Sequence, residues 1–168
     1  YKARFDDAQQ EAGEAAWPSP DILPWSTFIE RAWRTRADAQ GSPGLLSGLQ
    51  SQVVWERIIR NSPGAAMLNP GQTARQAMDA WSTACAWHLL PAMRAMPVST
   101  DVSLFMDWAN QFLRACRENG FVDSARLPEL WAQSLTSGAA GLPSRVLAAG
   151  FDIVTPQQVH VLRKLTEA

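Results

Sequence analysis

The residue types that most often carry chemistry are few in this chain and lie far apart. It has two histidines, His88 and His160, and neither belongs to an HxxxH, HExxH or mixed Cys/His spacing that binds a metal ion. His88 lies near the expected end of a long helix, where a protonated ring would suit the negative end of the helix dipole. We therefore expect no metal site and no acid–base role at either histidine.

Acidic residues show no catalytic spacing either. The acids at 6–7, Glu11 and Glu14 share a terminal helical segment with Lys2 and Arg4, which is most simply a solvated face. A phosphate-binding GxxxxGK(S/T) loop is absent from the sequence, and so is a nuclease pattern of a separated Asp followed by (D/E)xK. The sequence predicts no cofactor and no catalytic residue in this chain.

Tryptophan is frequent, with eight residues, and two interpretations stay open for the most interesting of them. Packing in a helical core is the simpler interpretation, and stacking on single-stranded DNA is the other, which needs an exposed ring beside a basic groove. Trp25 is the best candidate for stacking, since hydroxyls and arginines follow it. The predicted nucleic-acid contacts are Trp25, Ser26, Thr27, Arg31, Arg34 and Arg36.

Composition favours one globular domain or a domain fragment. The chain has 168 residues, 46% of them hydrophobic, and a formal net charge of −1, which argues against a dedicated nucleic-acid-binding module. Cys85 and Cys116 have no metal-ligand neighbours, so a reducing, cytoplasmic setting fits. No apolar run is long enough to span a bilayer. The charged start at Tyr1 is not a signal peptide, and a first residue of Tyr suggests a piece of a longer protein.

Helical patterns dominate the chain, so we predict a mostly α fold. One helix ends near Gly13. Another follows Pro24, is capped by Ser26 or Thr27, and has Phe28, Ile29, Ala32 and Trp33 on its apolar face. Further helices are expected over 47–59, with Leu49, Val53, Trp55 and Ile58 on the apolar side, and over 69–90, 100–119 and 127–135. Gly120 suits a C-cap.

The C-terminal stretch reads as a strand, a turn and a helix. Val146 to Ala149 is an apolar run with the length of a buried strand, and Gly150 ends it. Asp152 is a turn acid that can cap the following helix. Thr155 can also cap that helix, and Pro156 suits its first position.

This stretch resembles the Walker B region of superfamily 1 (UvrD-like) DNA helicases. Residues 147–158 read LAAGFDIVTPQQ against the family pattern LVDEFQDTSPLQ. Phe151, Pro156 and Gln158 fall on the helicase Phe, Pro and Gln, and Asp152 falls on a helicase Gln. Ala149 and Gly150 fall where the family has the Asp–Glu pair that holds the magnesium water shell and activates the hydrolytic water. The resemblance therefore implies that this chain keeps the Walker B strand but has lost the magnesium-binding and ATP-hydrolysing acids.

The degenerate pattern is similar to the inactivated helicase subunit of AddAB-type helicase–nucleases. It is closer still to a group of bacterial probable DNA repair proteins, helicase-like at the front with a PD-(D/E)XK nuclease at the back. Residues 17–33, 50–59 and 105–130 support that likeness. By resemblance, the chain is a single fragment over 1–168: strand-like flanks at 17–24 and 145–149, a helical body over 25–138, and a degenerate Walker B turn and helix over 150–168. The body would be the helical insertion subdomain, and the flanks would give a small parallel β element.

The function expected from the resemblance is non-catalytic. The fragment would guide single-stranded DNA, or scaffold the remaining helicase-like and nuclease domains of its parent protein or a partner motor subunit. The parent itself would be helicase-like, with a nuclease. The alternative is a stand-alone α-helical protein-interaction domain with no DNA role, which the near-neutral charge favours.

Overall fold

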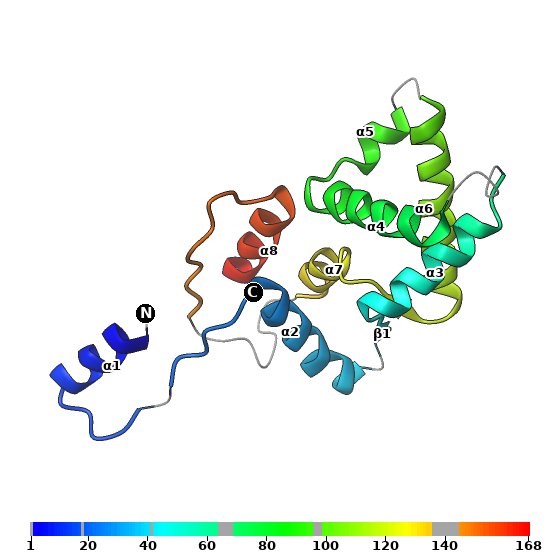
Figure 1. Cartoon of the computed structure of the whole chain (residues 1–168). Helices are drawn as coiled ribbons and strands as arrows, with labels where there is room; N and C mark the ends of the chain where they lie inside the picture. The colour runs from blue at the N-terminus through cyan, green and yellow to red at the C-terminus, as the bar shows by residue number, and fades with distance from the viewer. Residues whose placement is uncertain (1, 18, 41, 64–68, 96–98, 136–144) are drawn as a thin grey trace.

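The computed structural model describes residues 2–17, 19–40, 42–63, 69–95, 99–135 and 145–168. Within these ranges the chain forms eight helices and one two-stranded sheet, which confirms the mostly helical fold class. The helices are α1 (Lys2–Glu11), α2 (Trp25–Gln40), α3 (Gly48–Arg60), α4 (Pro70–Ala86), α5 (Leu90–Ala95), α6 (Thr100–Glu118), α7 (Leu127–Ser134) and α8 (Pro156–Glu167). Figure 1 shows α3 to α6 at one end of the molecule, α2, α7 and α8 in the middle, and α1 at the other end.

The larger hydrophobic core lies between α3, α4 and α6. Trp55 of α3 stacks on Phe112 of α6 with ring centroids 4.7 Å apart, and Trp81 of α4 meets Phe112 edge to face at 6.3 Å. Ala74 and Ala77 are buried on the same face of α4. Small side chains at these two positions let α4 pack closely against α3.

A second core joins α2, α7 and α8. Ile29 and Trp33 of α2 are buried here, which confirms the predicted apolar face of that helix. Trp131 of α7 is also buried, and Phe28 packs against it edge to face at 5.6 Å. Val161 of α8 is fully enclosed in the same cluster, so α8 is held by its apolar side against α7.

A short parallel sheet forms the boundary between the two cores. Strands β1 (Gly44–Leu45) and β2 (Phe121–Val122) pair in parallel, and the backbone bond from Leu46 N to Val122 O measures 2.8 Å. Leu46 is buried in the larger core, whereas Leu45 packs on the second one. Successive side chains of an extended chain point to opposite sides, so this segment anchors both cores.

Side-chain caps begin three of the helices. Thr155 caps α8 as predicted, and Ser47 and Asn69 cap α3 and α4 in the same way, each by accepting from a backbone N–H in the first turn. Gly120 follows α6 with a φ of 66°, a left-handed conformation that glycine adopts without a steric penalty. Local capping signals were therefore sufficient to place these boundaries.

Neither of the two predicted strand flanks forms a strand within this chain. Among the described residues of 17–24, and throughout 145–149, the chain forms neither helix nor strand. All the side chains over 145–150 are exposed, Leu147 at 65%. An apolar run specifies a tendency to be buried but supplies no partner strand, and within this chain α8 already fills the nearby core with Val161. The observed sheet instead uses 44–45 and 121–122.

Two details of the helices also differ from the prediction. Leu49 and Val53 are exposed, at 73% and 50%, because α3 turns the face with Ser51, Trp55 and Ile59 toward the core. Helix α2 begins at Trp25, with the Pro24 carbonyl accepting from Phe28 N, so Ser26 and Thr27 lie inside the first turn and do not cap it.

The helix predicted to reach Leu90 ends at Ala86, and α5 follows as a separate helix with Pro91 in its first turn. The reversal between the two helices is described below with His88. No helix in the ranges given above is both long and apolar enough to cross a membrane.

Candidate functional site

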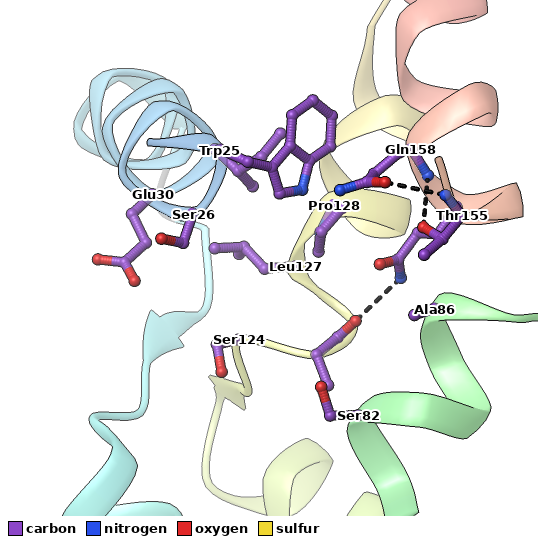
Figure 2. A pocket seen from close by; sticks show the side chains of 13 residues that line it. Trp25, Ser26, Glu30, Ser82, Ala86, Ser124, Leu127, Pro128, Thr155 and Gln158 are labelled. Carbon is purple, nitrogen blue, oxygen red and sulfur yellow. Dashed lines mark hydrogen bonds between the residues drawn. The ribbon is translucent and has the colours of Figure 1, made fainter. Parts of the chain in front are cut away.

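A pocket of about 210 Å³ brings together two regions that the sequence analysis singled out separately. It lies between α2, α4, α7 and the start of α8 (Figure 2). Trp25 and Ser26, predicted to contact DNA, line it together with Gln158, which lies in the segment predicted to be a degenerate Walker B region. The full lining is Trp25, Ser26, Ile29, Glu30, Ser82, Ala86, Ser124, Ala125, Leu127, Pro128, Thr155, Gln157 and Gln158.

Trp25 is half-buried and belongs to an aromatic cluster. Its ring meets Phe151 edge to face, with centroids 6.1 Å apart, and lies 6.4 Å from Phe28. These contacts use part of the ring surface that base stacking would need. Trp25 therefore packs against other aromatic side chains in this fold. A nucleobase could stack only on the part of the ring that these contacts leave uncovered.

The arginines that were predicted to contact phosphate are paired with acids. Arg31 forms an ion pair with Asp21, and Arg34 lies 3.6 Å from Glu30 one helical turn earlier. The hydrogen bond from Arg31 lowers the pKa of the Asp21 carboxyl and raises that of the guanidinium. Arg36 lies in α2, and its side chain is outside the described part. Each arginine of the two pairs is thus balanced locally, which weakens the positive field that phosphate would meet.

The segment that resembles a degenerate Walker B region divides into an exposed stretch and an ordered helix start. Ala149 and Gly150 are exposed, with Gly150 at a φ of 77°, and Asp152 is exposed as well. Thr155 makes a reciprocal capping box with Gln158: Thr155 N donates to Gln158 Oε1 at 2.9 Å, and Gln158 N donates to Thr155 Oγ1 at 3.3 Å. Thr155 is therefore the cap of α8, and the expected capping by Asp152 is wrong.

Pro156 and Gln157 complete the start of α8. Pro156 is the first helical residue, where its missing N–H leaves no hydrogen bond unmade. Gln157 is buried and donates from Nε2 to the Ala125 carbonyl at 2.9 Å, across 32 residues. The Gln157 side chain thus fixes the start of α8 to the turn before α7.

Asp123, a buried acid, connects the two cores, a role that no pattern in the sequence indicated. Its Oδ1 accepts from Trp81 Nε1 at 3.0 Å and from the backbone N–H groups of Ala125 and Arg126, while Oδ2 accepts from Arg126 Nε at 2.6 Å. The sequence indicated only that Asp123 begins a helical segment. A carboxylate with this many donors is a structural anchor, since its oxygens are already occupied.

The two histidines, which the sequence placed in unrelated helices, meet at Glu129. His88 Nε2 lies 3.5 Å from Glu129 Oε2, and His160 Nε2 lies 3.6 Å from Glu129 Oε1. The histidine rings are 6.5 Å apart. Within the described ranges, no group of three or more His, Cys, Asp or Glu side chains has an arrangement suited to a metal ion. No spacing in the sequence could have found this cluster, because three separate elements supply it.

The cysteines are poor nucleophiles in this fold. Burial raises the pKa of Cys85 to about 12 and that of Cys116 to about 11. The thiolate is the reactive form, so both side chains stay protonated and unreactive at neutral pH. Their role is to fill the larger core between α4 and α6.

Comparisons with protein-family models, with curated proteins and with solved structures gave no match to this chain.

Proposed function

We propose that this chain is a non-catalytic, helicase-like part of a DNA repair or recombination protein, and that it scaffolds the remaining helicase-like region of that protein. The observation that carries the proposal is the exposed apolar segment before α8. Val146, Leu147, Ile153 and Val154 are all exposed, Ile153 at 69%. This segment runs along the outside of the molecule into α8 (Figure 1).

The position of the segment fits the helicase resemblance. Residues 147–158 match the Walker B pattern, in which the apolar run is a strand of a parallel sheet. Such a strand needs neighbours on its backbone edges, and none of its own backbone N–H groups is hydrogen-bonded to backbone elsewhere in the described chain. We infer that the neighbours come from the remaining helicase-like region, and that joining its sheet covers Val146 and Leu147.

Two further observations support a scaffolding role over a chemical one. Ala149 and Gly150 stand where the helicase acids would be, and the Cys85 and Cys116 thiols stay protonated at neutral pH. The Trp25 ring is engaged with Phe151, and Arg31 and Arg34 are paired, which leaves little positive charge for guiding DNA. Of the two roles that the resemblance implies, guiding DNA is therefore less well supported than scaffolding the other domains.

The alternative of a stand-alone protein-interaction domain also has an observation in its favour. Trp87, Leu89 and Phe121 are exposed apolar side chains well outside the 145–154 segment. A domain that binds unrelated proteins would use such positions as readily as the C-terminal segment. The two functions therefore predict different binding surfaces.

A binding measurement with matched variants separates the two functions. The probe is the remaining helicase-like region of the parent protein, produced as a separate polypeptide and titrated with this chain by isothermal calorimetry. We expect binding that the pair Leu147→Asp and Ile153→Asp weakens at least about tenfold, since two exposed apolar contacts would become buried charges. Leu49→Asp is the control, because Leu49 is equally exposed but lies on α3. Binding that Leu89→Asp weakens and the pair leaves unchanged would favour the alternative.

A further inference from the structure

The only two histidines of the chain each approach a different oxygen of one carboxylate. His88 follows α4, Glu129 lies in α7 and His160 lies in α8, so three elements meet at this point. The nitrogen–oxygen distances of 3.5 and 3.6 Å are within ion-pair range but longer than a hydrogen bond.

The backbone at His88 makes this placement unusual. His88 has a φ of 53°, the only positive value outside glycine among the described residues. It occupies the left-handed position of a Schellman motif: Leu89 N donates to the Ala84 carbonyl at 2.9 Å and His88 N donates to the Cys85 carbonyl at 3.2 Å. Glycine is the usual residue there, since a side chain adds steric strain. Glycine would adopt this left-handed backbone more easily than histidine. The histidine that stands here instead places its imidazole beside Glu129.

Two polar atoms of the cluster are enclosed without a hydrogen-bond partner, although the His88 side chain is 44% exposed. Glu129 Oε2 and His160 Nε2 are shielded from solvent and have no hydrogen-bond partner. Glu129 Oε1 accepts only from Gln133 Nε2, at 3.2 Å. An ionised carboxylate with an unbonded, enclosed oxygen is stabilised when a neighbouring group gains positive charge.

Charged groups on the surrounding elements are mostly paired with one another. Burial keeps the Cys85 thiol on α4 neutral, with a pKa of about 12. The Lys164 hydrogen bond lowers the pKa of Glu167, and the charge of His160 contributes to this more weakly. The ion pairs are Asp123–Arg126 before α7, Lys164–Glu167 on α8, and Arg31–Asp21 and Arg34–Glu30 on and beside α2. Four other charged side chains on these elements are exposed to solvent: Arg163 of α8, Asp79 and Arg75 of α4, and Arg94 of α5.

We propose that His88, Glu129 and His160 form a proton-operated latch that holds α8 and the α4–α5 turn against α7. When the histidines take up protons, their contacts with Glu129 become charge-assisted and α8 is held more firmly. When they lose protons, the positive charge disappears and the carboxylate keeps only the bond from Gln133. The latch therefore tightens as pH falls from 8 to 6, a range in which histidine is the side chain that ordinarily titrates.

Chemical unfolding of the full chain at pH 6 and pH 8, followed by tryptophan fluorescence, tests the latch. We expect the unfolding equilibrium constant to be about twofold to fivefold smaller at pH 6, the range typical of partly exposed ion pairs. Glu129→Gln keeps the shape of the side chain and removes its charge, so it should abolish most of this ratio. Glu118→Gln removes the charge of an exposed glutamate on α6 and should leave the ratio unchanged.

Further variants assign the effect to the histidines. His88→Gly suits the left-handed backbone, so it removes the imidazole without adding strain, and combined with His160→Gln it should leave no change between pH 6 and pH 8. Should Glu129→Gln fold poorly, Glu129→Asp keeps the charge on a shorter side chain and should retain part of the ratio. Equal stability of the wild-type chain at both pH values, or a ratio that persists without the histidines, would overturn the proposal.

Discussion

Trp81 Nε1 donates a hydrogen bond of 3.0 Å to Asp123 Oδ1, and this bond spans 42 residues and joins the two hydrophobic cores. Trp81 belongs to the larger core of α3, α4 and α6, whereas Asp123 holds the turn that leads into α7. The same carboxylate also accepts from Arg126. Because both cores depend on it, we expect the two to unfold as one cooperative unit.

Asp123→Ala should therefore destabilise the whole chain. The substitution leaves the Trp81 indole and the Arg126 guanidinium without their acceptor in a region that is largely shielded from water. We expect a loss of about 2–4 kcal/mol in the free energy of unfolding. Urea unfolding at pH 7 measures it, with Asp79→Ala on the exposed side of α4 as the control. A loss equal to that of the control would contradict an anchoring role.

The aromatic stack in the larger core leads to a second stability prediction. Trp55 is almost fully buried against Phe112, whereas Trp87 is 44% exposed at the end of α4. Trp55→Ala should lower the free energy of unfolding by about 3–5 kcal/mol, since it leaves a large cavity. Trp87→Ala removes the same side chain and should cost less than about 1 kcal/mol. Similar losses in the two variants would mean that this core does not determine stability.

Much of this fold could be predicted from local sequence signals. The caps Ser47, Asn69 and Thr155 were predictable because a side chain and its own first turn form the bond. The failures share a different cause. The partner of a strand, the carboxylate that receives the Trp81 indole, and the acid between the two histidines are all set by contacts between distant segments. The apolar run at 146–149, for example, has the composition of a strand but finds no partner strand within this chain.

In the candidate site, too, the residues could be identified from local patterns, but their contacts with distant segments could not. The residues Trp25 and Gln158 were singled out from separate patterns, and the fold brings both to one pocket. Sequence could not show that Asp21 and Glu30 neutralise Arg31 and Arg34, because ion pairing depends on rotamers and on the path of the preceding loop. His88 was expected inside a helix because no glycine marks the turn where α4 ends.

DNA binding at the predicted patch should be weak. We expect an affinity for single-stranded DNA no tighter than about 10⁻⁴ to 10⁻⁶ M, falling as salt rises. Fluorescence anisotropy at low salt measures it. If the patch is used, Arg31→Glu with Arg34→Glu should weaken binding, and Asp21→Asn should strengthen it by freeing Arg31. Arg57→Glu with Arg60→Glu makes the same charge change on α3. Equal effects of the two double variants would exclude the patch.

Mg-ATP should produce no heat of binding in isothermal titration. The sequence contains no GxxxxGK(S/T) loop, and on the proposed helicase resemblance Ala149 and Gly150 stand where the acidic pair would be. The first-turn N–H of Gln158 is already bonded to Thr155 Oγ1 and is not free for phosphate. Binding in the micromolar range would contradict the proposed non-catalytic role.

The buried thiols should react slowly with a disulfide reagent. Burial raises the pKa of Cys116 from 9.0 to about 11, so its thiolate fraction at pH 8 falls about a hundredfold. Because these pKa values are higher in the folded state, the associated stability is present below pH 9 and is lost as pH rises toward about 12. Absorbance of the released thiolate at pH 8, with and without guanidinium, measures the protection. Equal rates in both conditions would show that the cysteines are accessible.

Hydrogen exchange over residues 145–154 tests the proposed scaffolding role most directly. The chain is measured alone and in the presence of the remaining helicase-like region of the parent protein, at one pH. Alone, these amides should exchange rapidly, since none donates to backbone within the described chain. On assembly, we predict that exchange of alternate amides over 146–149 slows at least about tenfold as strand pairing begins, while α6 stays unchanged. Unaltered exchange over 145–154 in a complex that has demonstrably formed would contradict the account.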